Sequence, residues 1–140
     1  MIILDTNVLS ELMRPAPNSK VAAWVGQQPT AHVFITTITQ AEILYGIELL
    51  PQGKRRESLR SAASELFTQD LAGRILAFDS DAAVAFAKIA ASRRQLGKPI
   101  SHADAQIAAI AQAQNATLAT HNVADFANCE INVVDPWLGA

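Results

Sequence analysis

The 140-residue chain has few of the residues that mark several classes of protein. Its single cysteine, Cys129, excludes an internal disulfide and is typical of proteins made in a reducing compartment. Tryptophan, tyrosine and phenylalanine together make up only 6%, so aliphatic side chains must fill the core. No basic segment followed by an apolar run opens the chain, so we expect no signal peptide and a cytoplasmic protein.

Long hydrophobic runs are also absent. Residues 21–41 contain no aspartate, glutamate, lysine or arginine, but Gly26, two glutamines and Pro29 interrupt them. Residues 105–124 contain three glutamines, two asparagines and His121. A helix that spans a membrane needs about 20 consecutive apolar residues. The sequence therefore predicts a soluble protein with no membrane segment.

Half of the residues are hydrophobic, and short apolar runs alternate with helical patterns. The runs predict strands at residues 1–4, 33–37, 74–78, 116–119 and 131–134. The helical patterns predict helices at residues 8–13, 19–25, 39–50, 54–69, 80–96 and 101–115, with one helical turn at 123–126. Buried strands separated by helices are typical of a parallel sheet covered on both faces. We therefore expect one α/β domain over residues 1–140.

Acidic and amide side chains lie where several of these elements meet. Asp5 directly follows the first strand, and Glu42 lies in the first turn of the helix after the second. Asp104 lies in the first turn of the helix at 101–115, and Asn122 and Asp125 follow the fourth strand. In open parallel sheets the functional crevice lies outside the carboxyl ends of the strands. We therefore expect these side chains to converge at one edge of the sheet.

Carboxylates gathered at one edge repel each other and raise each other's pKa. A hard divalent cation relieves that repulsion. Mg²⁺ and Mn²⁺ prefer oxygen ligands and are bound in proteins by a few carboxylates, water and substrate phosphates. Such an ion can activate a water molecule and neutralise charge on a phosphoryl group. The pattern therefore predicts a metal site that acts on phosphate esters.

Helix capping explains three of these acids without chemistry, and Asp125 can be an ordinary polar residue in a turn. The sequence alone leaves these alternatives open. Asp5 can cap the helix that follows it. Thr39 and Glu42 have the spacing of a capping box, and Ser101 and Asp104 have nearly the same spacing. An acidic residue in the first turn is also favoured by the helix dipole.

Four segments together match a known family: residues 1–7 (MIILDTN), 38–46 (ITQAEILYG), 104–109 (DAQIAA) and 118–126 (LATHNVADF). They resemble PIN-domain ribonucleases and, more narrowly, the toxins of VapBC-type and FitAB-type toxin–antitoxin pairs. The match covers nearly the whole chain in the expected order. The resemblance implies a PIN fold, with a five-stranded parallel sheet in the order 3-2-1-4-5 and helices on both faces. It also implies Mg²⁺- or Mn²⁺-dependent cleavage of RNA.

The resemblance implies a role for each residue of the candidate site. Asp5, Glu42 and Asp104 match the three acidic positions that bind the metal. Asp125 would be the remaining catalytic acid, acting through water, with Asn122 a neutral ligand or hydrogen-bonding partner. Which of the two fills the fourth position, and whether one or two ions bind, stays open. The expected supporting residues, which would hold water, carboxylate oxygens or the loop after the first strand, are Thr6, Asn7 and Thr120.

The resemblance also implies partners: an RNA substrate, a cognate antitoxin and a second copy of the chain in a homodimer. Without the four site acids the formal net charge changes from −2 to +2, which suits RNA better. Basic residues cluster at 54–56 with Arg60, and at 93–94 with Lys98, where they can contact phosphates. A solvated helix face is the commoner explanation for such clusters, and we prefer it for Arg55 and Arg56.

Two other functions fit parts of the sequence. A Mg²⁺-dependent phosphatase of the haloacid-dehalogenase type also begins with a strand and an aspartate, but it needs a second aspartate where this chain has Asn7. A catalytically weak PIN-like module that mainly binds a protein partner is the other alternative, which the neutral Asn122 favours. His102 and His121 are expected near the crevice, with no assigned role.

Overall fold

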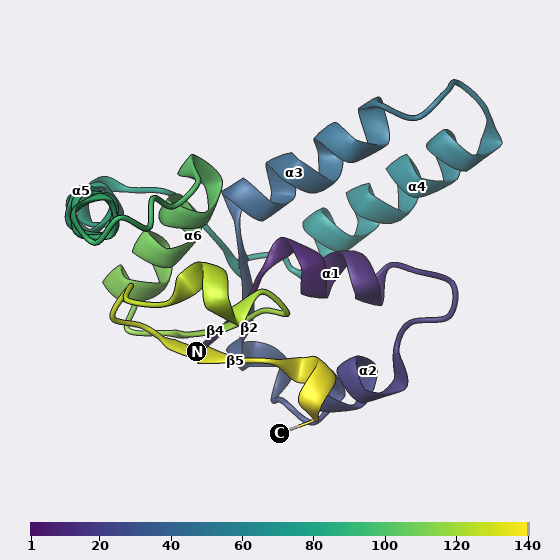
Figure 1. Cartoon of the computed structure of the whole chain (residues 1–140). Helices are drawn as coiled ribbons and strands as arrows, with labels where there is room; N and C mark the ends of the chain where they lie inside the picture. Colours follow the sequence, from purple (N-terminus) through teal and green to yellow (C-terminus); the bar gives the residue numbers. More distant parts are fainter. Residues whose placement is uncertain (140) are drawn as a thin grey trace.

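The computed structural model describes residues 1–139. Its five strands form one parallel sheet in the order β3-β2-β1-β4-β5, which confirms the predicted topology (Figure 1). The strands are β1 (Ile2–Leu4), β2 (Val33–Thr36), β3 (Ile75–Leu76), β4 (Thr117–Ala119) and β5 (Asn132–Val134). The first strand of the chain therefore lies at the centre of the sheet.

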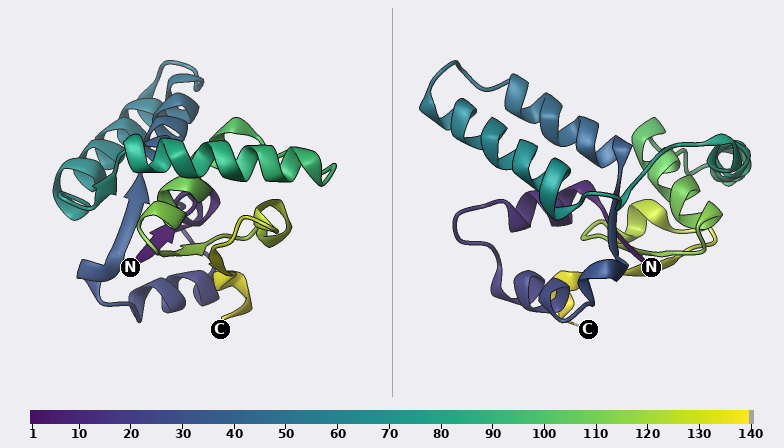
Figure 2. Two further views of the ribbon diagram at one scale, coloured as in Figure 1. Left: turned by 90° about the vertical axis from the view of Figure 1, so that its left-hand side faces the viewer. Right: turned by 180° about the vertical axis from the view of Figure 1, so that it is seen from behind.

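Six α-helices connect and cover the strands over residues 1–139. They are α1 (Thr6–Leu12), α2 (Ser19–Gly26), α3 (Thr37–Glu48), α4 (Lys54–Glu65), α5 (Ser80–Gln95) and α6 (His102–Ala113). Shorter turns are η1 (Thr30–His32), the π-helical η2 (Leu66–Asp70), η3 (Val123–Phe126) and η4 (Pro136–Leu138). Helices α3 and α4 lie side by side and extend away from the sheet as an antiparallel pair (Figures 1 and 2).

The core consists of two hydrophobic clusters, one on each face of the sheet. Successive residues of a strand point to opposite faces. In β1, Ile3 accordingly packs with side chains of α5 and α6, whereas Leu4 packs with side chains of α1, α2 and α3. Both are almost completely buried. The expectation of helices on both faces is therefore confirmed.

Side-chain caps start several helices where the sequence predicts them. Asn18 accepts hydrogen bonds from the first turn of α2, Asp79 caps α5 and Ser101 caps α6. Each oxygen satisfies a backbone N–H that has no partner within the helix. Asp5 caps α1, so that helix begins at Thr6, two residues before the predicted start.

The predicted start of α3 is wrong, and with it the capping box of Thr39 and Glu42. The helix begins at Thr37, and the hydroxyl of Thr36 accepts the hydrogen bond from the backbone N–H of Thr39. Strand β2 therefore ends at Thr36. Glu42 lies in the second turn of α3 rather than the first, where it caps nothing.

Other predicted boundaries differ more modestly. The helix expected at 54–69 is α-helical only to Glu65, after which a wider turn follows, with a hydrogen bond from Leu71 to Leu66. The strand expected at 74–78 pairs with β2 only over Ile75–Leu76, at the edge of the sheet. No helix within residues 1–139 has the length and apolar character needed to cross a membrane.

Candidate active site

Asp5 lies at the carboxyl end of the central strand, with only 4% of its surface exposed. Its Oδ1 accepts a hydrogen bond from the backbone N–H of Thr6 at 2.8 Å. Its Oδ2 accepts bonds from Thr120 Oγ1 at 2.8 Å and Asn7 Nδ2 at 3.0 Å. A carboxylate offers about four acceptor positions, so these three donors leave room for one more partner, such as a cation.

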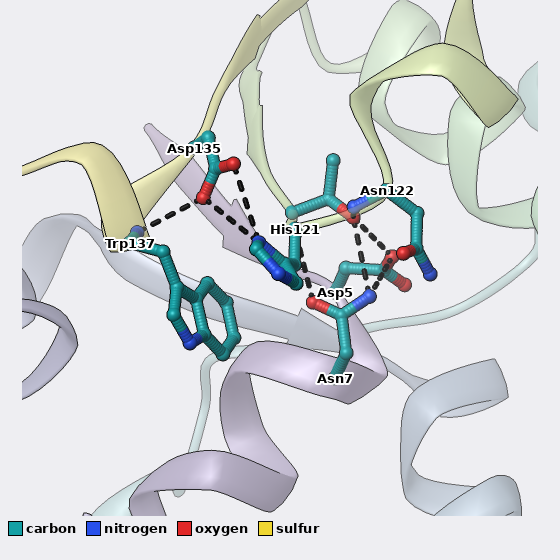
Figure 3. A network of polar contacts seen from close by, with 7 residues as sticks. Asp5, Asn7, His121, Asn122, Asp135 and Trp137 are labelled. Atoms are coloured by element: carbon teal, nitrogen blue, oxygen red, sulfur yellow. Dashed lines mark hydrogen bonds and ion pairs between the residues drawn. The ribbon is translucent and has the colours of Figure 1, made fainter. Parts of the chain in front are cut away.

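A network around Asp5 joins the ends of two neighbouring strands (Figure 3). Asn7 Nδ2 also donates to Thr120 Oγ1 at 3.2 Å, and Asn7 Oδ1 accepts the backbone N–H of His121 at 3.0 Å. Thr120 Oγ1 accepts a further bond from the backbone N–H of Asn122 at 3.1 Å. These contacts fix the loop after β1 against the loop after β4, which fits the supporting positions expected for Asn7 and Thr120.

Glu42 reaches the same edge from α3, with its side chain exposed. Its Oε1 accepts a hydrogen bond from Thr6 Oγ1 at 2.7 Å, and Thr6 Oγ1 lies 3.0 Å from Thr39 Oγ1. The single proton of the Thr6 hydroxyl goes to the carboxylate, so Thr39 must donate to Thr6. Thr39 is fully buried and belongs to this support. From the sequence, Thr39 is expected only to cap a helix.

Asp104 lies half-buried in the first turn of α6, and its backbone N–H donates to Ser101 Oγ at 3.2 Å. Burial raises the pKa of its carboxyl group, and a hydrogen bond with Ser101 opposes that shift. The charges of Asp125 and Glu42 raise the pKa of Asp104 further.

The pKa of Asp5 is raised for similar reasons. Burial is the main cause, hydrogen bonds from Thr120 and Thr6 oppose it, and the charges of Asp104 and Glu42 add to it. Like charges affect each other this way only when they lie close together. Four acids from distant parts of the chain therefore share one electrostatic field at the carboxyl edge of the sheet.

Asp125 and Asn122 lie exposed in and beside η3. The loop is held from α5 by Arg93, which is only 6% exposed. Its Nη1 donates to the carbonyl oxygens of Asp125 at 2.7 Å and Ala127 at 3.0 Å. Neither interpretation of its cluster, contact with phosphates or a solvated helix face, fits Arg93, because its guanidinium is used inside the protein. Its role in holding the loop has no local signal in the sequence.

Two residues of the other basic cluster are engaged as well. Arg56 and Arg60 both form ion pairs with Glu48 of α3, at 2.6 and 2.8 Å. His102 packs on the ring of Phe86, with the ring centroids 5.1 Å apart. These residues stabilise helix contacts and leave the carboxylate edge as the candidate site.

The donor chemistry fits a hard divalent cation, because the site presents carboxylate and hydroxyl oxygens. Within residues 1–139, however, no group of three or more His, Cys, Asp or Glu side chains is arranged to hold one ion. Mg²⁺ is commonly bound by one or two carboxylates, with water and substrate phosphate completing its coordination. The arrangement suits that open kind of site better than a closed cage.

Comparison with known proteins finds relatives over nearly the whole chain. The family model described as PIN domain matches residues 2–130. The plasmid stability protein StbB of Pseudomonas syringae pv. tomato is 42% identical, over 98% of this chain and 99% of that protein. The toxin FitB of Neisseria gonorrhoeae is 39% identical, over 98% and 99%. The VapC ribonuclease Y4jK of Sinorhizobium fredii is 37% identical, over 98% of each.

Solved structures show the same fold. A structure of FitAB bound to an IR36 DNA fragment contains a chain with 39% identity and a TM-score of 0.92, covering 98% of this chain and 96% of that one. The structure of VapBC-1 from nontypeable Haemophilus influenzae gives 29% identity and a TM-score of 0.78, covering 99% of each chain.

Proposed function

This chain belongs to the PIN-domain family, and from that membership we propose that it is a metal-dependent endoribonuclease and the toxin of a toxin–antitoxin pair. The names of its relatives, the toxin FitB and a VapC ribonuclease, support both parts. The observation that carries the proposal is the shared electrostatic field of Asp5, Glu42, Asp104 and Asp125 at the carboxyl edge of the sheet.

Asp5, Glu42 and Asp104 would hold Mg²⁺ or Mn²⁺, in part through water. When bound, the ion supplies an activated water molecule and neutralises charge that develops on the phosphate. Asn7 and Thr120 fix Oδ2 of Asp5, so that Oδ1 keeps its remaining acceptor position for the ion.

The remaining residues hold the surroundings of that site. The hydroxyl pair of Thr39 and Thr6 keeps one oxygen of Glu42 directed to the edge. We assign the fourth position to Asp125, which would hold water beside Asp104, and we give Asn122 the part of a neutral hydrogen-bonding partner. Outer partners of metal ligands usually contribute roughly 10- to 100-fold to activity or metal affinity.

Cleavage of a labelled RNA by the purified chain tests the proposal. We expect cleavage with Mg²⁺ or Mn²⁺, none with a chelator, and none by the variants Asp5→Asn and Asp104→Asn. The matched control is Glu130→Gln, because Glu130 is exposed just before β5, at the opposite edge of the sheet. Cleavage that persists in the Asp5→Asn variant or in chelator would contradict the proposal.

We also propose that a cognate antitoxin binds this chain in the cytoplasm and blocks the site. FitAB and VapBC-1 are the corresponding two-component assemblies among the solved structures. Expression of this chain alone should slow growth, and co-expression with the neighbouring open reading frame should restore it. Equal growth in both cases, with folded protein present, would count against the proposal that this chain is a toxin.

A homodimer is the proposed assembly of the free chain. Its mass in solution should be about twice the 15.0 kDa of one chain, measured by light scattering after gel filtration. A single species of one-chain mass at micromolar concentration would exclude it.

A catalytically weak module that mainly binds the antitoxin is the second candidate. The lack of a three-residue metal group within residues 1–139 and the neutral Asn122 favour it. It predicts tight binding of the antitoxin together with RNA cleavage no faster than that of the Asp5→Asn variant. The cleavage assay described above therefore separates the two candidates.

A further inference from the structure

His121 lies beside the candidate site, yet the proposed chemistry does not use it. Its backbone N–H donates to Asn7 Oδ1, and Asn7 Nδ2 donates in turn to Asp5 Oδ2. In Figure 3 the imidazole lies between Asn7 and the pair formed by Asp135 and Trp137. Its side chain is 52% exposed, so a ligand at the site can reach it.

The imidazole is held in one orientation by two contacts from the end of the chain. Its Nδ1 lies 3.3 Å from both carboxylate oxygens of Asp135, and its ring lies on the ring of Trp137 with centroids 4.3 Å apart. Asp135 is itself fixed, because its Oδ1 accepts the backbone N–H of Trp137 at 2.9 Å and its side chain is only 11% exposed. The position of the outer ring nitrogen, Nε2, follows from these contacts.

The same contacts decide which ring nitrogen carries the proton. An ionised carboxylate only accepts hydrogen bonds, so in the neutral imidazole the proton must be on Nδ1, facing Asp135. Nε2 is then a bare acceptor. Within residues 1–139 the hydrogen bonds of the ring all use Nδ1, so Nε2 of His121 is open to a ligand.

A bare acceptor binds a donor, and this restricts the part of a nucleic acid that it can contact. Phosphate oxygens and the ring oxygen of the sugar are acceptors. The one donor on the backbone of RNA is the ribose 2′-hydroxyl, which DNA lacks. A hydroxyl that donates to Nε2 would satisfy both groups, whereas a phosphate would face an unprotonated nitrogen beside several carboxylates.

Building on the proposed ribonuclease function, we propose that Nε2 of His121 accepts a hydrogen bond from a ribose 2′-hydroxyl next to the cleaved bond. His121 is thereby a substrate-binding residue that makes the site prefer RNA to DNA. Asp135 and Trp137 are positioning residues, which hold the proton on Nδ1 and the ring in place.

The test combines a change in the protein with a change in the substrate. His121→Asn keeps an amide N–H close to the place of Nδ1, able to donate to Asp135, and removes the group at Nε2. His121→Gln instead retains an acceptor near Nε2 and loses the link to Asp135. His32→Asn is the matched control, because His32 is exposed in η1 ahead of β2, at the far edge of the sheet. Melting temperatures verify that each variant folds.

The substrates are one RNA of defined cleavage site and copies with a single 2′-deoxynucleotide on either side of that site. Cleavage is measured in alkaline buffer with Mg²⁺. One deoxynucleotide should lower kcat/KM of the unmodified chain by roughly 3- to 10-fold, the effect of one hydrogen bond. On the full RNA, kcat/KM of His121→Asn should be lower than that of the unmodified chain by the same factor. On the deoxy substrate, kcat/KM of His121→Asn should fall no further. The variants His121→Gln and His32→Asn should still cleave the full RNA with a higher kcat/KM than the deoxy substrate.

Discrimination by His121→Asn equal to that of the unmodified chain would overturn the inference, as would equal cleavage of all substrates by the unmodified chain. These results differ from failure of the proposed function, in which the unmodified chain cleaves none of the RNAs.

Discussion

Single residues at the candidate site carry charges that oppose folding. The pKa values of Asp5 and Asp104 are both raised, chiefly by burial. The folded chain therefore binds protons at these carboxyl groups more tightly than the unfolded chain does. Such unfavourable charges are typical of sites that bind a cation or carry out catalysis.

The first prediction concerns Asp104→Asn in metal-free buffer. An acid with a raised folded pKa favours folding fully below its unfolded pKa, and this contribution is lost as the pH rises through the folded value. The variant has no such group, so its melting temperature should exceed that of the unmodified chain at neutral pH. The difference should shrink as the pH falls toward the ordinary pKa of an aspartate, 3.8.

Glu130→Gln is the control for this measurement, since Glu130 is exposed at the other edge of the sheet. Its melting temperature should follow that of the unmodified chain at every pH. A variant Asp104→Asn that is less stable than the unmodified chain at neutral pH would show that the carboxylate stabilises the fold, contrary to the raised pKa.

The second prediction concerns Arg93, whose guanidinium donates to the carbonyl oxygens of Lys98, Asp125 and Ala127. Arg93→Met would leave these acceptors without a donor, and each buried unpaired acceptor is costly. We expect the free energy of unfolding to fall by about 2–4 kcal/mol, measured by urea denaturation. Arg94→Met, at an exposed neighbouring position, should change it by no more than about 0.5 kcal/mol. Equal effects of the two substitutions would contradict the role of Arg93.

At the scale of elements, the boundaries that depend on local signals could be predicted. Ser101 is a single capping residue before a helical pattern and caps the helix expected there. For the helix expected at 80–96 either Asp79 or Ser80 can be the cap, and in the structure it is Asp79. The predicted start of α3 is wrong because Thr36 and Thr39 are equally good capping residues. Only the strand pairing, which holds β2 to residue 36, decides between them.

In the candidate site, too, the residues with a local sequence signal could be predicted, whereas the contacts between distant residues could not. Asp5 and Asp104 stand out because each lies where a strand or helix pattern begins or ends. The contacts that support the site join residues far apart in sequence, such as Thr6 with Glu42 and His121 with Asp135. No local pattern records such pairs, because they depend on how α3 and η4 lie against the sheet edge.

The third prediction concerns the start of α3. Thr36→Val keeps the shape of the side chain but removes the oxygen that caps the helix, and Thr36→Ser keeps that oxygen. Loss of a capping oxygen costs about 0.5–2 kcal/mol. Thr36→Val should therefore be less stable to urea than Thr36→Ser. It should also lose cleavage activity, because the first two turns of α3 place Thr39 and Glu42. A valine variant as stable and active as the serine variant would contradict this.

At the scale of the whole molecule, ion binding and folding should be coupled. An ion that binds only the folded chain stabilises it by about 2.7 kcal/mol at a concentration 100 times its Kd. Addition of Mg²⁺ or Mn²⁺ should therefore raise the melting temperature of the unmodified chain, and a chelator should reverse the change.

Asp104→Asn provides the comparison, because it removes one proposed ligand and leaves the backbone cap at Ser101 intact. Its melting temperature should respond to the ions much less. An equal rise in both proteins would indicate binding elsewhere on the chain, and no rise in either would count against a metal site at this edge.

The central place of β1 also bears on how the molecule is made. The strand is translated before both of its neighbours, which begin at residues 33 and 117, so its pairing with β4 must follow synthesis of the segment between them. Asp5 is therefore synthesised long before the helix that carries Asp104. The proposed nuclease site therefore cannot be complete before the segment that carries Asp104 has been made.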